Sequence, residues 1–160
     1  MPDHRTSPCP GTILVVDDDD LFLRVCSAVL RHAGFVVEAL SDPTRVLDRL
    51  KAGRFDAVVS DVRMPQVDGV QLLKAIRSHD AAIPVLLMTG QPTIEAAIQA
   101  IEHRALRMLQ KPFEVDVLID AVRAAVRSRS SNAPNHLHEK LDRSLATLHM
   151  AYQPIVGMAE

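Results

Sequence analysis

The chain has 160 residues, of which 48% are hydrophobic, and its formal net charge at pH 7 is −2. That length suits one domain with an appendage. Acidic and basic residues nearly balance, which argues against a nucleic-acid or anionic-membrane partner. The two cysteines, Cys9 and Cys26, are too few for a disulfide framework. With no leader or spanning segment in the pattern, we expect a cytoplasmic protein that neither enters a membrane nor binds nucleic acid.

Strands and helices alternate along most of the chain. Residues 1–11 are rich in proline and polar residues and predict a disordered lead-in. Apolar runs then predict strands at 12–16, 35–40, 55–60, 83–88 and 106–110. The runs are apolar throughout, as strands buried on both faces require. We therefore predict an α/β fold, with a parallel sheet covered by helices on both faces.

Helices are predicted after each strand from apolar residues that recur on one face. The first helix follows Asp19 and Asp20, whose carboxylates suit a helix start. The second begins near Asp42 and ends at Gly53, and the third opens at Gly69. The apolar faces predicted for the first, fourth and fifth helices are Phe22, Val25, Cys26 and Val29, then Ile94, Ala97, Ile98 and Ile101, then Val115, Leu118, Ile119 and Val122.

The composition changes after residue 127, where we place the end of a first domain that spans 12–127. Residues 128–135 are rich in Ser, Asn and Pro and predict a linker. An apolar stripe typical of an amphipathic helix follows, and it consists of Leu137, Leu141, Leu145 and Leu148. The extended apolar piece "AYQPIVGMA" comes next. We interpret 136–160 as the helix and first strand of a second, truncated domain.

Polar side chains stand directly after four of the predicted strands. Asp17 and Asp18 follow the first strand, Asp61 the third, Thr89 the fourth and Lys111 the fifth. Because ligands bind at the carboxyl ends of parallel strands, we expect these side chains to share one crevice. Clustered carboxylates favour Mg²⁺, and a lysine beside a hydroxyl suits an anionic oxygen. This equipment predicts phosphoryl transfer, with a carboxylate as a possible nucleophile.

The segments "VVDDD", "DAVVSDVRMPQVDG", "LLMTG" and "LQKPF" stand in this order along the chain. In order and approximate spacing they resemble the receiver domain of two-component response regulators, over about residues 12 to 127. The resemblance implies a flavodoxin-like (CheY-like) sheet of order 2-1-3-4-5. It also implies a bacterial signalling domain, not an enzyme in its own right, that takes a phosphoryl group from a histidine kinase or phosphotransfer protein.

The resemblance also implies a role for each residue of the crevice. Asp61 is expected to be the phosphoacceptor, while Thr89 and Lys111 are expected to hold phosphoryl oxygens. The Lys111–Pro112 peptide bond is expected to be cis, which proline tolerates. The expected ligands of Mg²⁺ are Asp17, Asp18, Asp61 and the backbone carbonyl of Arg63.

Several positions are expected to tune the reactivity of the site, and others depart from the family pattern. Gly90 is expected to leave room for the phosphodonor, and Arg63 and Gln91 lie where side chains tune dephosphorylation. Met108 replaces the usual switch aromatic of the fifth strand, so an unusual transmission step is expected, with a flexible apolar side chain in its place. Arg104 replaces a common glycine. If that turn needs a positive φ, the arginine carries a strain of about 1 kcal/mol.

The last part of the chain, "LDRSLATLHMAYQPIVGMAE", resembles the opening of EAL-type cyclic-di-GMP phosphodiesterase domains. The resemblance covers about 25 residues and implies that the receiver regulates such an output domain. The Glu-Ala-Leu motif itself would lie beyond residue 160.

Two alternatives remain open. One is a receiver that acts as a docking or dimerisation module, with a homodimer formed by the fourth helix, fifth strand and fifth helix or by the helix at 136–149. The other is a haloacid-dehalogenase-type phosphatase with Asp17 as nucleophile and Asp19 as the acid two positions later. The second leaves Asp61 without a role, and the acids after Lys111 lie on the polar face of a helix.

Overall fold

The structure, a computed structural model, describes residues 11–131. The lead-in at 1–10, most of the predicted linker and the predicted second domain lie outside the described residues. Within the described range, no helix is both long and apolar enough to cross a membrane.

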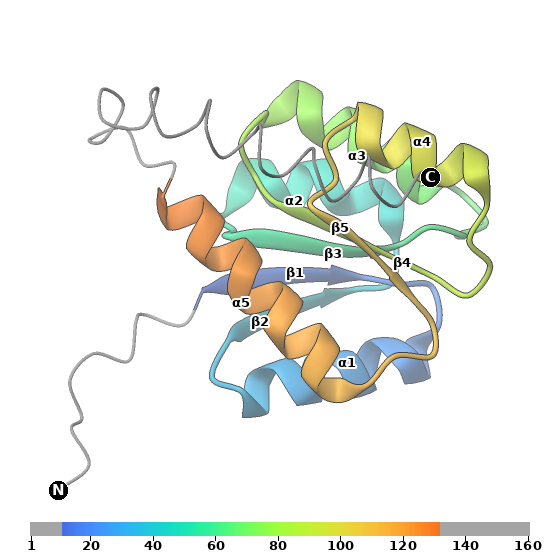
Figure 1. Cartoon of the computed structure of the whole chain (residues 1–160). Coiled ribbons are helices and arrows are strands. Elements are labelled where there is room, and N and C mark those ends of the chain that lie inside the picture. The colour runs from blue at the N-terminus through green and yellow to red at the C-terminus, as the bar shows by residue number, and fades with distance from the viewer. Residues whose placement is uncertain (1–10, 132–160) are drawn as a thin grey trace, which may run out of the picture. The chain divides into compact units, whose positions relative to one another are not determined.

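Five parallel strands form a single sheet in the order β2-β1-β3-β4-β5, as predicted (Figure 1). The strands are β1 (Thr12–Val16), β2 (Val36–Leu40), β3 (Ala57–Asp61), β4 (Val85–Thr89) and β5 (Arg107–Gln110). The central strands β3 and β4 are buried at every residue, whereas the edge strands β2 and β5 are partly exposed. The expectation of strands buried on both faces therefore holds for the centre of the sheet and fails at its edges.

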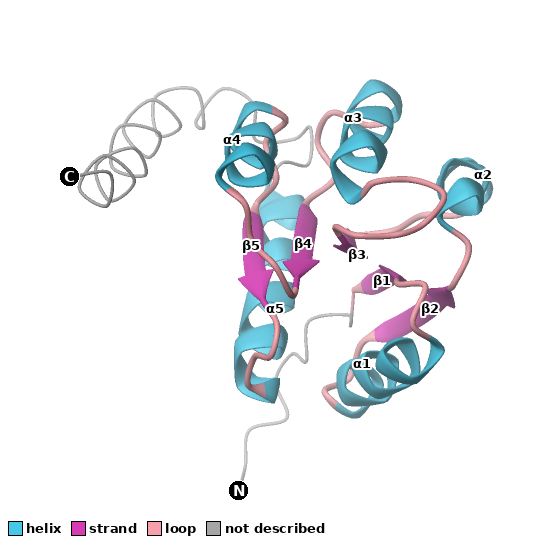
Figure 2. Ribbon diagram, turned by 90° about the vertical axis from the view of Figure 1, so that its right-hand side faces the viewer, coloured by secondary structure: helices cyan, strands magenta, loops and turns pink. Residues whose placement is uncertain are grey.

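Helices cover both faces of the sheet (Figure 2). The helices are α1 (Asp20–His32), α2 (Val46–Ala52), α3 (Gly69–His79), α4 (Ile94–Glu102) and α5 (Val115–Ser131), and a 3₁₀ turn, η1 (Pro43–Arg45), precedes α2. Side chains of α1 and α5 form one core with one face of the strands, and α2, α3 and α4 form a second core on the other face. Because helices cover both faces, polar groups can gather only where the strands end, which is at the carboxyl edge or the amino edge of the sheet.

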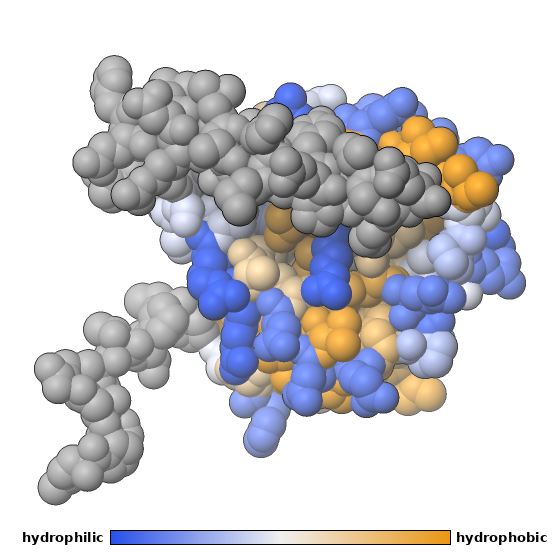
Figure 3. All heavy atoms as spheres, in the orientation of Figure 1, coloured by the Kyte–Doolittle hydropathy of each residue, from blue (hydrophilic) through white to orange (hydrophobic). Residues whose placement is uncertain are grey.

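Two helix faces differ from the prediction. In α1 the predicted Cys26 is buried, and Phe22 and Val29 pack against the same core, but Val25 is 52% exposed and the buried face also includes Leu23 and Leu30. In α4 the predicted face is turned outward, since the predicted isoleucines are largely exposed, and only Ala100 is buried. Hydrophobic periodicity identifies a stripe but does not say whether the stripe meets the core. Figure 3 shows the resulting apolar surface over α4.

The observed limits of the domain differ from the predicted limits by a few residues. Gly11, assigned to the lead-in, is buried, and its carbonyl accepts a hydrogen bond from the N–H of Val36 at 3.1 Å. Helix α5 continues to Ser131, four residues past the predicted end of the domain at 127. Arg129 in the last turn of α5 binds Asp80, which holds the helix end against the loop before β4. The serine-rich composition therefore did not mark the helix end.

Candidate functional site

Four polar side chains converge at the carboxyl edge of the sheet, where the sequence predicted them. Asp17 follows β1 directly, Asp61 and Thr89 end β3 and β4, and Lys111 follows β5. Asp17 and Thr89 are 1% exposed and Asp61 is 7% exposed. Buried polar residues at the end of an otherwise apolar sheet are costly unless they have partners. Their presence marks this edge as the candidate site.

Lys111 joins two of the carboxylates. Its Nζ donates to Oδ2 of Asp17 at 2.9 Å and lies 3.1 Å from Oδ1 of Asp61. The other carboxylate oxygen of Asp17 accepts from the backbone N–H of Asp19 at 2.9 Å. The Lys111–Pro112 peptide bond is cis, as predicted. One ammonium therefore lies between the ends of β1 and β3.

Three carboxylates form a cluster next to this ammonium. Asp17, Asp18 and Asp61 each offer an oxygen, and these oxygens lie within 4.8 Å of one another. Asp18 is exposed, while its two neighbours are buried. Clustered carboxylate oxygens are the donors that a hard divalent cation such as Mg²⁺ prefers. The donor set and its spacing therefore fit a cation site.

The pKa values of Asp61 and Lys111 are both raised, but for different reasons. Burial raises the pKa of the Asp61 carboxyl, the hydrogen bond and charge of Lys111 oppose that change, and the charges of Asp17 and Asp18 add to it. Burial acts to lower the pKa of the Lys111 ammonium, but its bonds to Asp17 and Asp61 together raise it. Three acids with one base leave negative charge that a cation would neutralise.

The loop after β4 provides the mouth of the site. The hydroxyl of Thr89 accepts a hydrogen bond from the backbone N–H of Gln91 at 3.1 Å. The side chains of Arg63 and Gln91 are exposed and hydrogen-bonded to each other at 2.6 Å. A Cβ built at Gly90 would meet nothing within 4 Å, so the space expected beside this residue is present.

The remaining residues named from the sequence occupy defined places. Asp19 caps α1, and its side chain accepts from the N–H groups of Leu21 and Phe22. This use of the carboxylate weakens the alternative in which Asp19 serves as a catalytic acid. Met108 is partly buried and packs against the core on the α2–α3–α4 face. Arg104 has φ of 60°, which confirms that this turn requires the left-handed region.

The start of α3 lies directly against the candidate site. Asp68 caps the helix and accepts from the N–H of Val70 at 2.7 Å. A Cβ at Gly69 would lie 2.3 Å from the backbone oxygen of Asp61, a distance that no side chain can occupy. The segment "VDG" is therefore more than a simple turn, because its glycine permits close approach of α3 to β3.

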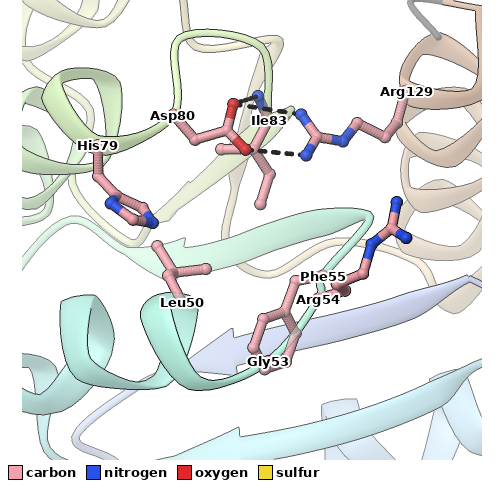
Figure 4. Close-up of a pocket in the computed structure, with 8 residues that line it drawn as sticks. All are labelled: Leu50, Gly53, Arg54, Phe55, His79, Asp80, Ile83 and Arg129. Carbon is pink, nitrogen blue, oxygen red and sulfur yellow. Dashed lines mark hydrogen bonds and ion pairs between the residues drawn. The ribbon is translucent and has the colours of Figure 1, made fainter.

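A hollow lies at the opposite, amino edge of the sheet. It has a volume of about 170 Å³ and is lined by side chains that include Phe55, Asp80, Ile83 and Arg129 (Figure 4). These residues precede β3 and β4 or end α5, so the hollow is remote from the carboxylate cluster. No sequence motif predicted a site in this region.

Residues 13–123 match the model of the family described as "Response regulator receiver domain". Among curated proteins, the chain is 39% identical over 117 residues to the transcriptional regulatory protein FixJ of Bradyrhizobium diazoefficiens, which covers 73% of this chain and 57% of the relative. It is 36% identical over 146 residues to the C4-dicarboxylate transport regulatory protein DctD of Pseudomonas aeruginosa, which covers 91% of this chain and 31% of the relative. The chain thus spans only part of the relatives it matches.

Solved structures show the same fold. Full-length FixJ from B. japonicum has a TM-score of 0.75 at 35% identity, covering 88% of this chain and 68% of that chain. The signal receiver domain of an HD domain-containing protein from Pseudomonas fluorescens has a TM-score of 0.73 at 29% identity, covering 77% of this chain and 99% of that one. A CheY-like receiver from Methanospirillum hungatei, with a TM-score of 0.74 at 20% identity and covering 78% and 99%, shares the fold.

Proposed function

This chain belongs to the response regulator receiver family, and from that premise we propose that Asp61 is its phosphoacceptor. A receiver is a signalling domain of two-component systems and not an enzyme. The observation that carries the proposal is the position of Asp61. It is the only carboxylate among the described residues that both ends a central buried strand and lies beside the Lys111 ammonium and two further acids.

The proposed step is a single phosphoryl transfer. A carboxylate oxygen of Asp61 attacks the phosphorus of a phosphohistidine or of a small acyl phosphate, and the bond from phosphorus to the donor breaks. The leaving group keeps the bonding electrons, and an aspartyl-phosphate forms. Lys111 is near enough to Asp61 to neutralise a developing phosphoryl oxygen, and the hydroxyl of Thr89, at the end of the neighbouring strand, would donate to another.

We further propose that the carboxylate cluster holds Mg²⁺. Asp17, Asp18 and Asp61 would be ligands through their side chains, with Arg63 adding its backbone carbonyl. The ion would neutralise charge on the transferring phosphoryl group, as in other phosphoryl-transfer sites. The spacing of the three carboxylates supports this assignment. The exposed Arg63 and Gln91 at the mouth would influence how fast water reaches the aspartyl-phosphate, and the space at Gly90 would admit the donor.

Phosphorylation of the chain itself tests the proposal. The protein is incubated with Mg²⁺ and acetyl phosphate, and the covalent phosphate is located by mass spectrometry of peptides. We expect one acid-stable, base-labile phosphate on Asp61, and none in an Asp61→Asn variant that retains the fold. Asp116→Asn, at an exposed carboxylate on α5, is the matched control and should be phosphorylated as the wild type. Sustained hydrolysis that requires Asp17 would instead support the phosphatase alternative.

The output controlled by this receiver is a separate proposal. The "YQPIV" segment supports an attached EAL-type cyclic-di-GMP phosphodiesterase, and its residues lie outside the described range. Relatives carry names of different kinds, including a DNA-binding transcriptional regulator and an HD domain-containing protein, so similarity in the receiver does not identify the output. For the same reason the expectation of no nucleic-acid partner stays a prediction. Absence of a Glu-Ala-Leu motif in the few dozen codons after residue 160 would remove the phosphodiesterase proposal.

The partners follow from the family. A histidine kinase or phosphotransfer protein would supply the phosphoryl group in the cytoplasm, and the attached domain would receive the signal. The exposed isoleucines Ile94, Ile98 and Ile101 on α4 support the further proposal of a docking or homodimer surface there. Sedimentation of the chain with and without acetyl phosphate would detect such a dimer.

A further inference from the structure

The Lys111 ammonium has an aromatic ring on one side. Its Nζ lies 3.9 Å from the centroid of the Phe22 ring, in addition to its contacts with Asp17 and Asp61. The face of an aromatic ring carries partial negative charge and attracts a cation within about 6 Å of its centroid. Lys111 is only 20% exposed, so water screens this attraction less than it would on an open surface.

The position of Phe22 is set by one hydrogen bond of its backbone and one contact of its ring. Phe22 lies in the first turn of α1, where its N–H donates to the Asp19 carboxylate at 3.2 Å. The ring of Phe113 meets it edge to face, with centroids 6.0 Å apart and an interplanar angle of 81°. Because Phe113 follows Lys111 by two residues, the helix and the loop after β5 fix the ring and the ammonium relative to each other.

An aliphatic residue would not replace this ring. Leucine at position 22 would still pack against the core that Phe22 covers, but it carries no negative face. The ammonium thus has the two carboxylates and the ring as neighbours, and all three limit its movement. Without the ring, the lysine chain would gain rotamers that turn the ammonium away from Asp61.

We propose that Phe22 is a positioning residue that holds the Lys111 ammonium toward Asp61 through a cation–π contact, an inference that rests on Asp61 being the phosphoacceptor. Phe22 does not touch the phosphoryl group. It acts through the lysine, whose contribution to the transfer depends on its distance from the reacting oxygens.

Nuclear magnetic resonance tests the contact without any phosphorylation. The ring current should shift the ε-methylene protons of Lys111 upfield in the wild type, measured on protein alone. The shift should be lost in Phe22→Leu and kept in Phe22→Tyr, which retains the ring face. Phe35→Leu is the matched control, since Phe35 is a partly buried phenylalanine packed on the same core, and it should leave the Lys111 signal in place.

Phosphorylation kinetics with acetyl phosphate and Mg²⁺ test the consequence. Phe22→Leu should be phosphorylated roughly threefold to tenfold more slowly than the wild type, the change in rate expected from losing one cation–π contact. Phe22→Tyr should restore the rate, and Phe35→Leu should not change it. If Phe22→Leu does not fold, Phe22→Met takes its place, and the wild-type signal is measured in either case.

The outcomes separate the two proposals. A Lys111 methylene signal at its ordinary position in the wild type would overturn the positioning role, whatever the phosphorylation assay shows. Equal rates for Phe22→Leu and wild type would do so too, as would equal slowing by Phe35→Leu. A wild type that takes no phosphate, with the Lys111 shift present, would instead overturn the role of Asp61 and confirm the contact alone.

Discussion

The two edges of the sheet use aspartate in opposite ways. At the carboxyl edge Asp61 shares one ammonium with Asp17, lies near Asp18, and has its pKa raised by burial. At the amino edge Asp80 accepts from the two terminal guanidinium nitrogens of Arg129, at 3.2 and 2.8 Å, and from the N–H groups of Ala82 and Ile83 at 2.9 and 3.1 Å (Figure 4). Burial acts to raise the pKa of Asp80, but these bonds and the charge of Arg129 hold it below its usual value.

The amino edge is also crossed by a second arginine. Arg77 of α3 donates to the carbonyls of His103 at 3.1 Å, Arg104 at 2.8 Å, Asp80 at 3.4 Å and Ile83. One side chain thereby satisfies carbonyls at the ends of two helices and before β4, which would otherwise lack donors. The amino edge is therefore built for stability, whereas the carboxyl edge keeps a repulsion between carboxylates that a ligand can relieve.

Removal of the Arg77 side chain should destabilise the fold more than any other change considered below. Arg77→Ala should lower the free energy of unfolding by about 3 kcal/mol, because it removes charged donors from several carbonyls at once. Arg77→Lys should recover only part, since an ammonium cannot reproduce the planar fork. Urea unfolding measures both. The control is Arg123→Ala, at an exposed arginine whose contact with Asp120 is 4.0 Å long, and it should change little. A loss below 1 kcal/mol for Arg77→Ala would break the contrast between the edges.

A smaller effect, with a defined pH dependence, is expected at Asp80. Asp80→Asn should cost about 1 to 2 kcal/mol at pH 7, because the charged bonds to Arg129 become neutral ones. Since the folded protein lowers this pKa, the stabilisation is present above the ordinary value of 3.8 and is lost as the pH falls through the folded pKa. Wild-type and variant stabilities should therefore converge in acid, as followed by urea unfolding at several pH values. A constant difference would show that Asp80 acts by shape and not by charge.

A change at the carboxyl edge should alter the stability less, and it should stabilise the protein instead of destabilising it. Asp61→Asn should raise the stability in metal-free buffer at pH 7 by up to about 1 kcal/mol. A raised pKa means that the carboxylate is disfavoured by folding, so wild type should approach the variant as the pH falls through that raised pKa.

Addition of Mg²⁺ should reverse the order of these two proteins. At ten times its Kd the ion should stabilise the wild type by about 1.4 kcal/mol and the variant much less. Thermal unfolding with Mg²⁺ or with a chelator gives both values. Stabilisation of the two proteins to the same degree would place the cation elsewhere.

The sequence predicted the fold and the gathered site residues because each functional residue stands at the end of an apolar strand. The place of Asp17, Asp61, Thr89 and Lys111 follows from that simple geometry, whereas the strand order was implied by the resemblance to receiver domains. Helix-capping residues such as Asp19 could also be predicted from the sequence, because a cap and the N–H groups it binds are close together in the chain.

Contacts between side chains distant in sequence could not be predicted in this way. No pattern marks Phe22 as the neighbour of Lys111, or Arg77 as the donor to the turn at Arg104. The face of α4 was misassigned for a related reason. Ile94 and Ile98 have the spacing of a core stripe, but the small Ala100 faces the sheet and the isoleucines face outward.

The contact at Gly69 has a consequence for how the domain can change shape. Since the first residue of α3 touches the backbone of Asp61 with no side chain between them, the end of β3 and the start of α3 form a single mechanical unit. A shift of the Asp61 backbone would therefore carry α3 with it, and position 69 is closed to every other amino acid.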